Sequence, residues 1–475
     1  MQSLVVSLFP QAVLALLSCV VLVLSTFKRP SKCSLSYIAS AVLIVVGVLC
    51  FQGYPENAFL SVGSYQIDSL TRLGLMAIFV HAGLYWLLVR PSLLKESFKE
   101  VESLTLILLS CLGMSLMVGS KQLLLTYLGI ELMSLPLYAL VVMNAHTRSI
   151  EAAIKYFITG AVASGLLLYG MSLVYVATGS LEYTLWSKSS SFFMSGSQMT
   201  LLSTGAVLMA SGLFFKMGVV PFHMWVPDVY EGAPSSITAY ISSIPKLVTS
   251  IVLIRLFSYS QPHLIAEWKN VLLISGILSI VLGNIMALTQ SSVKRMLAYS
   301  SIAHMGFIFL ALWAFTQQGT EAALFYAIVY LILSTTSFAI LPWILKGSKE
   351  IEWISDLKGF NLENEKGAAI ILILMFALMG IPPLAGFMSK LSVLNALIDQ
   401  KAWSIAIIAI LMSVIGAAYY LKVIRVTYFE GNSAVAKFSV DSRLSMMVMV
   451  LMVIAIIILG VWPTGLLQIC HQALI

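Results

Sequence analysis

A lysine stands within an apolar stretch that is long enough to cross a membrane. Lys216 follows an apolar run that begins near Leu201, and the break Gly218-Val-Val-Pro221 comes directly after it. At about 1.5 Å per helical residue, Lys216 lies roughly 22 Å along such a helix, inside a hydrocarbon layer about 30 Å thick. An ammonium group there costs about 2.5–3.5 kcal/mol unless it lies in a water-filled cavity or beside a carboxylate. The position therefore indicates a functional lysine.

Other titratable side chains also occur within or beside apolar stretches. They are Glu131, Lys155, Lys246, Lys390 and His304. A carboxylate and amines that approach and separate can pass protons onward at neutral pH. Lysine suits a sodium site poorly, because it repels a cation and offers no lone pair when charged. This inventory predicts a proton relay through the membrane.

Each of these residues also has a structural explanation. Glu131 and Lys216 could form a static buried ion pair that fixes helix packing, and Lys155, a few residues into its helix, could extend to the membrane surface. Lys246 could bind the backbone carbonyl that the proline before it leaves free, and His304 could be a hydrogen-bonded packing residue. The sequence leaves these alternatives open.

Three polar residues follow the break after Lys216. His223, Asp228 and Glu231 are expected near the membrane interface, either as accessory members of the relay or as parts of a hydrogen-bonded turn. One histidine is too few for a zinc site. Asp68 and Arg72, four residues apart at the start of a predicted helix, are expected to form a local ion pair.

The composition excludes a soluble globular protein. Hydrophobic residues make up 60% of the 475 residues and charged residues 10%, and the mean hydropathy is +0.97. The apolar segments lack the alternating pattern of a membrane β-barrel, so the fold is predicted to be an all-α polytopic membrane protein. The net charge of +7 is spread over short loops, which argues against a nucleic-acid partner. The cysteines show no CxxC pair, so no redox centre, cofactor or metal is expected in this chain.

About 14 transmembrane helices are predicted, as one transmembrane domain over residues 1–475. They lie at roughly 4–26, 35–52, 69–89, 103–119, 122–143, 152–178, 201–226, 235–257, 270–289, 296–315, 321–345, 368–398, 402–424 and 445–465. Lysine and arginine gather in alternate loops, which predicts that both termini lie outside the cytoplasm, on the periplasmic side in a bacterial inner membrane. The polar segments 347–367 and 427–444 are expected to be solvated connectors.

Two fragments repeat with the same offset along the chain. Met217-Gly-Val-Val-Pro221 in the seventh predicted helix matches Met379-Gly-Ile-Pro-Pro383 in the twelfth, five helices later. An odd offset places the two copies in opposite orientations, which predicts inverted five-helix repeats with discontinuous helices 7 and 12. The divisions are then N-terminal helices 1–3 in residues 1–100, a first repeat in 101–258, a second in 270–430, and helix 14 in 443–475.

Several motifs resemble the antiporter-like subunits of proton-pumping NADH:quinone oxidoreductase, respiratory complex I, and its subunit N group in particular. They are Gly-Ile-Glu131-Leu-Met-Ser-Leu-Pro, Glu151-Ala-Ala-Ile-Lys155-Tyr, the stretch from Lys216 to Pro234, Val-Lys294-Arg-Met-Leu-Ala-Tyr-Ser-Ser-Ile-Ala-His304, and Gly380-Ile-Pro-Pro-Leu-Ala-Gly-Phe-Met-Ser-Lys390. The resemblance covers essentially the whole chain.

The resemblance implies a proton-translocating membrane subunit. In this family a central proton path is proposed through the positions of Glu131, Lys155, Lys216, Lys246 and Lys390. FMN, iron–sulfur clusters and quinone are expected on partner subunits, namely a peripheral NADH-oxidising arm and neighbouring membrane-arm subunits. The alternatives are a subunit of a multisubunit sodium/proton antiporter, a stand-alone solute transporter and a purely structural subunit.

Overall fold

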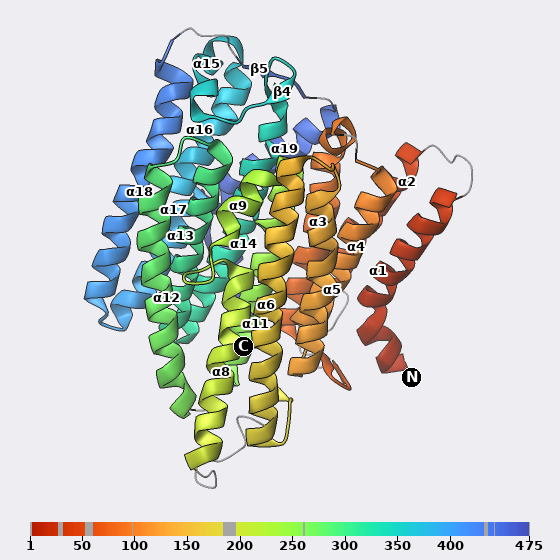
Figure 1. Cartoon of the computed structure of the whole chain (residues 1–475), viewed down its shortest axis with the longest axis vertical. Coiled ribbons are helices and arrows are strands. Elements are labelled where there is room, and N and C mark those ends of the chain that lie inside the picture. The colour runs from red at the N-terminus through yellow and green to blue at the C-terminus, as the bar shows by residue number, and fades with distance from the viewer. Residues whose placement is uncertain are drawn as a thin grey trace.

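The computed structural model describes residues 2–26, 32–52, 60–96, 98–183, 196–259, 262–431, 436–440 and 442–474. Long helices dominate these residues (Figure 1). The helices of the first half are α1 (Gln2–Thr26), α2 (Lys32–Gln52), α3 (Ser69–Lys95), α4 (Glu100–Val118), α5 (Leu123–Val142), α6 (Thr147–Thr178), α8 (Gly196–Met217), α9 (Trp225–Gly232), α10 (Ser235–Ile241) and α11 (Ile244–Ser258). Those of the second half are α12 (Pro262–Leu288), α13 (Val293–Trp313), α14 (Gln317–Ala339), α15 (Phe360–Glu363), α16 (Glu365–Met379), α17 (Ala385–Asp399), α18 (Trp403–Phe429), α19 (Arg443–Val461) and α20 (Thr464–Leu474).

Twelve segments of the described chain are long and apolar enough to cross a membrane, and α10 with α11 counts as one of them. Two predicted spans are not among the twelve. One is α1, whose described apolar part is Leu8–Leu24, and the other is divided into α16 and α17. Each of these halves has 15 residues, about 22 Å of helix, so neither half alone covers a hydrocarbon layer of about 30 Å.

The helix breaks lie where the repeated fragments predict them, with one addition. The helix α8 ends at Met217 and α16 at Met379, and the glycine after each has a positive φ, 72° at Gly218 and 87° at Gly380. A left-handed backbone at this position ends a helix at little cost only with glycine. The sequence did not predict the break between α10 and α11, at Ser242 and Ser243.

The end of the bundle with α15 carries a small sheet, and we call it the loop end. The strands are β3 (Ile344–Lys346), β4 (Lys349–Glu350) and β5 (Lys437–Phe438), and β3 pairs antiparallel with both others. The two polar segments predicted to be plain connectors are therefore partly folded against each other. Near the opposite end, β1 (Leu60–Val62) and β2 (Tyr65–Ile67) form a hairpin.

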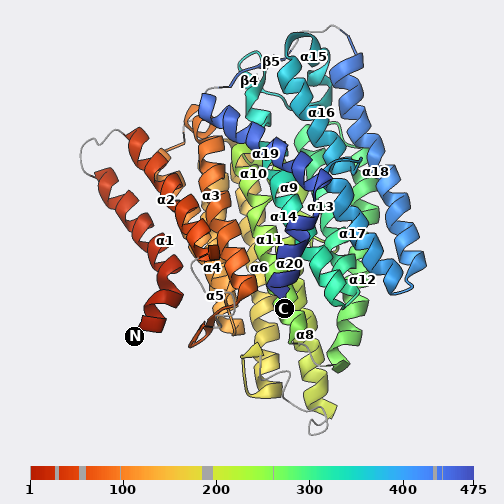
Figure 2. The ribbon, with the colours of Figure 1, turned by 180° about the vertical axis from the view of Figure 1, so that it is seen from behind.

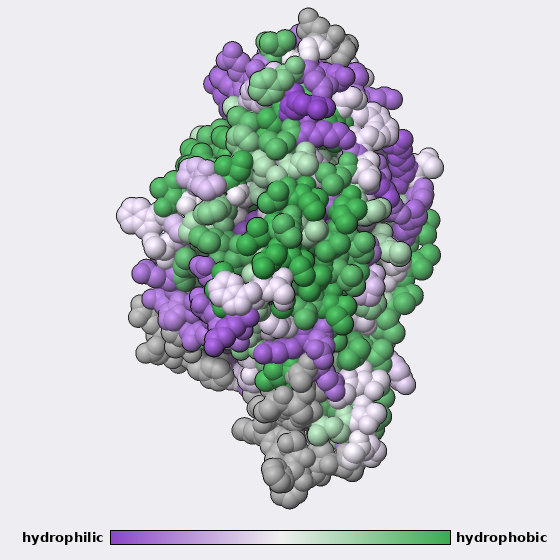
Figure 3. Space-filling view, turned by 90° about the vertical axis from the view of Figure 1, so that its left-hand side faces the viewer, coloured by the Kyte–Doolittle hydropathy of each residue, from purple (hydrophilic) through white to green (hydrophobic). Residues whose placement is uncertain are grey.

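Apolar side chains form a broad band on the outer face made by α12 and α18, with hydrophilic residues gathered above it (Figure 3). Ile407, Leu411 and Val414 of α18 are among the exposed members of this face. By contrast, the α10–α11 segment, α13 and α14 are largely enclosed by other helices. The band matches a lipid-facing surface, whereas the enclosed helices can hold polar groups.

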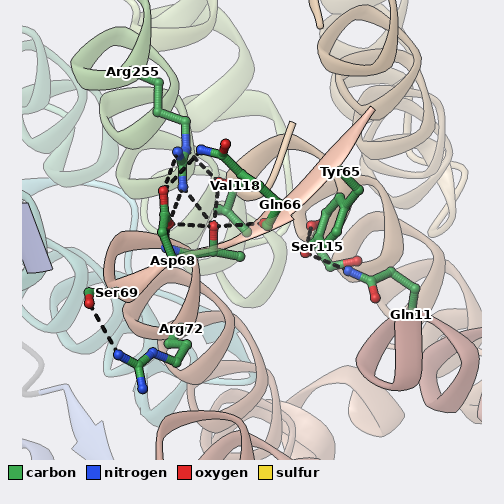
Figure 4. A network of polar contacts seen from close by, with 10 residues as sticks. Gln11, Tyr65, Gln66, Asp68, Ser69, Arg72, Ser115, Val118 and Arg255 are labelled. Atoms are coloured by element: carbon green, nitrogen blue, oxygen red, sulfur yellow. Dashed lines mark hydrogen bonds and ion pairs between the residues drawn. The ribbon is translucent and has the colours of Figure 1, made fainter. Parts of the chain in front are cut away.

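An ion pair between Arg255, which is buried, and Asp68, which is partly buried, lies near the end opposite the loop end, and Figure 4 shows its contacts. Asp68 caps α3 and accepts hydrogen bonds from both terminal nitrogens of Arg255 in α11, at 2.8 and 2.6 Å. Arg255 also donates to the carbonyl of Val118 at 2.7 Å. The predicted local pair is therefore corrected: Asp68 binds Arg255, while Arg72 donates to Ser69. The long-range pair satisfies the carboxylate and ties α3, α4 and α11 together.

Burial alone would raise the pKa of Asp68, but Arg255 and hydrogen bonds from Thr71 outweigh it and hold the pKa below its ordinary value. The carboxylate is therefore charged at neutral pH.

Candidate functional site

Lys216 is buried in the last turn of α8, with 5% of its surface exposed. Its ammonium group donates to the hydroxyls of Ser134 at 2.9 Å and Tyr138 at 3.4 Å. Both partners lie on the face of α5 that carries Glu131, three and seven residues further on. Glu131 itself accepts a hydrogen bond from Ser164 of α6. Lys216 and Glu131 therefore do not form the expected ion pair directly. The ammonium group donates its hydrogen bonds to neutral hydroxyls instead.

The break after Lys216 is held by side chains rather than left open. The indole nitrogen of Trp225 donates to the carbonyl of Phe215 at 2.9 Å, and Ser279 of α12 accepts from the backbone nitrogen of Val220 at 2.9 Å. These bonds satisfy backbone groups that the end of α8 releases. The Lys216 side chain is thus anchored to a rigid helix end.

Aromatic rings connect Lys216 to Lys246. Each ring contacts the next in the order Tyr138, Tyr156, Trp225 and Tyr230. The ammonium group of Lys216 lies 5.8 Å from the centre of the first ring, and that of Lys246 lies 5.5 Å from the centre of the last. Such contacts favour a cation without supplying a countercharge. The buried Tyr230 hydroxyl has no hydrogen-bond partner among the described residues.

Lys246, in the first turn of α11, is 1% exposed and donates to the Ser301 hydroxyl of α13. Lys246 therefore binds a hydroxyl and not the backbone carbonyl that the sequence offered as an alternative partner. His304 lies three residues after Ser301 on the same helix and is also buried. Its Nδ1 lies 2.7 Å from the Tyr326 hydroxyl, and its Nε2 lies 3.2 Å from that of Tyr420. Both ring nitrogens of His304 therefore have hydroxyl partners.

Lys390 of α17 is bound at the second break. Its ammonium group donates to the carbonyl of Met379, the last residue of α16, at 2.8 Å and to the Ser413 hydroxyl of α18 at 2.9 Å. A cavity of about 10 Å³ is lined by both Lys390 and His304, together with Tyr420. This volume is close to the minimum that holds one water molecule. The second half of the site thus places His304 and Lys390 on one small polar cavity.

Lys155 lies apart from these buried groups. Its ammonium group pairs with Glu151 at 2.8 Å and Asp228 at 2.9 Å, and its side chain is 45% exposed. Arg295 of α13 joins the cluster by pairing with Asp228 and Glu231, both at 2.9 Å. These residues line an open hollow of about 380 Å³. The geometry agrees with the surface alternative for Lys155 and places Asp228 and Glu231 in an ion-pair network.

The remaining polar residue of this segment, His223, is partly exposed and its Nδ1 has no hydrogen-bond partner among the described residues. For Asp228, burial raises the pKa, but hydrogen bonds from Lys155 and Arg295 more than compensate, so the pKa lies below its ordinary value. Asp228 is thus a charged partner in the ion-pair network.

The sequence-based prediction missed the hydroxyl partners of the lysines. Ser134 binds Lys216, Ser301 binds Lys246 and Ser413 binds Lys390. Serine is common in helices, so single occurrences carry no signal. The spacing could have suggested two of them, since Ser134 lies three residues after Glu131 and Ser301 three residues before His304.

The chain is similar to known membrane proteins over most of its length. Residues 120–416 match the family described as NADH:quinone oxidoreductase/Mrp antiporter, TM. Proteins named NADH-quinone oxidoreductase subunit N are similar over nearly the whole chain. That of Laribacter hongkongensis is 36% identical, covering 98% of this chain and 96% of its own, and that of Azoarcus sp. is 38% identical, covering 97% and 96%.

Among solved structures, a chain of respiratory complex I from Thermus thermophilus is 29% identical with a TM-score of 0.81, covering 97% of this chain and 98% of that one. A chain of the Mrp complex from Dietzia sp. is 17% identical with a TM-score of 0.83, covering 98% and 95%, and shows the shared fold alone. The chain therefore belongs to the NADH:quinone oxidoreductase/Mrp antiporter family, within its subunit N group, as a membrane-arm proton-translocation subunit of an NADH:quinone oxidoreductase.

Proposed function

We propose that protons cross this subunit through Glu131, Lys216, Lys246, His304 and Lys390. The observation that carries the proposal is that all three lysines donate to neutral oxygens and none has a carboxylate within ion-pair distance among the described residues. A buried ammonium group without a countercharge is costly, so each lysine can exist as a charged or a neutral amine.

The first step of the proposed mechanism is a movement of the Lys216 ammonium group. Ser134 and Glu131 lie on one face of α5, so a change in the neighbouring subunit can shift Lys216 between the serine hydroxyl and the carboxylate. Charge on Lys216 then acts on Lys246 through the intervening aromatic rings, which exclude water and so weaken screening. The proton that leaves Lys246 passes by Ser301 and His304 to Lys390.

The same proposal covers the wider organisation. The predicted repeats, residues 101–258 and 270–430, act as two inverted half-units. Each contains one helix break, after Met217 in the first and after Met379 in the second. The loop end faces the cytoplasm, because it carries most of the basic loops. Flavin, iron–sulfur clusters and quinone reside on partner subunits, which supply the energy for proton movement.

The test is NADH-driven proton transport in inside-out vesicles that carry the complete complex with Lys216→Ala or Glu131→Ala. We expect proton transport through this subunit to fall about a hundredfold, in the range of a lost acid–base group, while the complex still assembles. The matched control is Lys366→Ala, an exposed lysine near the start of α16. Normal transport in both site variants would refute the proposal.

A further inference from the structure

Two carboxyl groups bind adjacent residues at the start of α10, at the loop end. Ser236 donates to Glu96 at 3.5 Å, and Ser235 donates to Glu350. Glu96 follows the end of α3, and Glu350 belongs to β4. Lys294 of α13 faces the same two carboxyl groups and donates to the carbonyl of Ala233 at 2.9 Å. Glu96, Glu350 and Lys294 are each partly exposed as residues, so this cluster lies within reach of water at the loop end.

The surroundings keep a proton on this pair near neutral pH. Burial raises the pKa of Glu96 to about 8, the charge of Glu350 adds to this shift, and Lys294 and the hydrogen bond from Ser236 oppose it. Burial also raises the pKa of Glu350, opposed by Lys294 and Ser235. A carboxyl group that titrates near the working pH can both release and regain a proton.

The helices α3 and α10 lie side by side (Figure 2), and polar residues on them continue inward from this pair. The Tyr85 hydroxyl of α3 donates to the carbonyl of Ser236 at 2.7 Å, and its ring lies 4.9 Å from that of Tyr240 in α10. The ring of His81, one turn before Tyr85, lies 5.9 Å from Tyr85 and 6.1 Å from Tyr240. The row therefore leads from the loop end to a buried histidine.

His81 lies beside the break between α10 and α11. Its Nε2 lies 2.9 Å from the Thr335 hydroxyl and 3.5 Å from that of Ser243, and its Nδ1 is buried without a hydrogen-bond partner among the described residues. The backbone nitrogen of Lys246 donates to the Ser243 carbonyl at 3.1 Å. His81 is thus 5% exposed and contacts Ser243, at the start of the turn that carries Lys246. One of its ring nitrogens has no partner among the residues that the structure describes.

We propose that Glu96, paired with Glu350, collects protons at the loop end, and that His81 passes them to Lys246 at the α10–α11 break. The proton leaves the Glu96 carboxyl group, which regains one from water. The imidazole takes a proton on one ring nitrogen and releases one from the other, and the neutral amine of Lys246 accepts it. This access route rests on the proposed function of Lys246, and it is separate from the Lys216 side of the relay.

The first test uses the pH dependence of NADH-driven proton transport in inside-out vesicles, where the predicted cytoplasmic side faces the medium. Glu350→Gln removes the neighbouring negative charge and should move the alkaline limit of transport to lower pH. Lys294→Gln removes the opposing positive charge and should move it to higher pH. A packing defect would not shift the limit in opposite directions, so unshifted or equally shifted profiles would overturn the proposal.

The second test compares Glu96→Gln and His81→Gln with matched controls at the same end. The controls are Glu102→Gln, an exposed carboxylate in the first turn of α4, and His146→Gln, the exposed residue before α6. We expect about a tenfold loss of transport in both site variants and none in the controls, with recovery in Glu96→Asp. Transport at the normal rate in both site variants would exclude the route.

The two proposals fail in different ways. If Glu96→Gln and His81→Gln transport normally while Lys246→Ala does not, the access route is wrong and the proposed function stands. If Lys246→Ala also transports normally, the proposed function itself is wrong. Should His81→Gln fail to assemble, the opposite pH shifts of Glu350→Gln and Lys294→Gln still decide the question.

Discussion

Two kinds of buried charge occur in this protein, and they are bound differently. At one end, Arg255 meets the Asp68 carboxylate in a two-pronged ion pair, with further bonds to Thr71 and the Val118 carbonyl. In the middle, Lys216 and Lys246 meet only neutral hydroxyls and aromatic rings. The first arrangement satisfies both charges in one geometry, whereas the second gives the ammonium groups no carboxylate in direct contact.

The difference separates a structural charge from a movable one. An ion pair with good geometry holds its protons and its position, because changing either would leave a buried charge alone. A lysine bound to hydroxyls loses much less when its proton leaves, since a neutral amine can accept a hydrogen bond from the same hydroxyls. We therefore expect the Asp68–Arg255 pair to contribute to stability and the lysines to serve the proposed transport.

The largest effect on stability is expected at the paired site. Arg255→Met leaves Asp68 without its partner in a mostly buried position, which should cost about 3 kcal/mol or more. Arg255→Lys restores the positive charge but not the two parallel hydrogen bonds of the planar guanidinium group, so it should recover only part of the lost stability. The measurement is thermal unfolding of the purified complex together with the amount of subunit that assembles. An Arg255→Met protein as stable as the parent would remove the distinction between the two kinds of charge.

The next effect should appear in transport alone. Lys390→Met should reduce proton transport about a hundredfold and leave the unfolding temperature unchanged or higher, because an apolar side chain replaces a partly buried amine that has no carboxylate partner among the described residues. Lys366→Met, an exposed position near the start of α16, serves as the control. A clear loss of stability in Lys390→Met would mean that the lysine is a structural charge like Arg255.

The sequence predicted the buried charges well and their partners poorly. The apolar runs around Lys216 and Lys246 and the Met-Gly fragments defined the helix breaks, because burial and glycine conformations follow directly from residue type. The partners depend on how distant helices meet. Ser301 reaches Lys246 from 55 residues away and Asp68 reaches Arg255 from 187 residues away. No local spacing rule contains that information, so the predicted pair Asp68–Arg72 was wrong, and Glu131 and Lys216 are not in direct contact.

A smaller effect concerns the response of the paired site to acid. The pKa of Asp68 is lowered in the folded protein, so its contribution to stability is fully present above about pH 4, the ordinary range of an aspartate. That contribution is lost as the pH falls through the lowered value. Asp68→Asn should therefore flatten the acid side of the stability curve, measured as unfolding temperature against pH. If the unfolding temperature of Asp68→Asn fell with acid as it does in the parent protein, other carboxyl groups would govern the acid response.

The smallest effect on stability and transport is expected at Lys155, a lysine that has carboxylate partners but lies at the surface. Its partners Glu151 and Asp228 supply countercharge, as in the Asp68–Arg255 pair, but its side chain is 45% exposed and water screens the interaction. Lys155→Gln should therefore change stability by less than about 1 kcal/mol and leave NADH-driven proton transport near the parent rate. Arg295, which also pairs with Asp228, keeps that carboxylate compensated in the variant. If Lys155→Gln instead abolished transport with the complex intact, Lys155 would belong to the relay, as the family resemblance implies. A carboxylate partner would then not be enough to identify a lysine as structural.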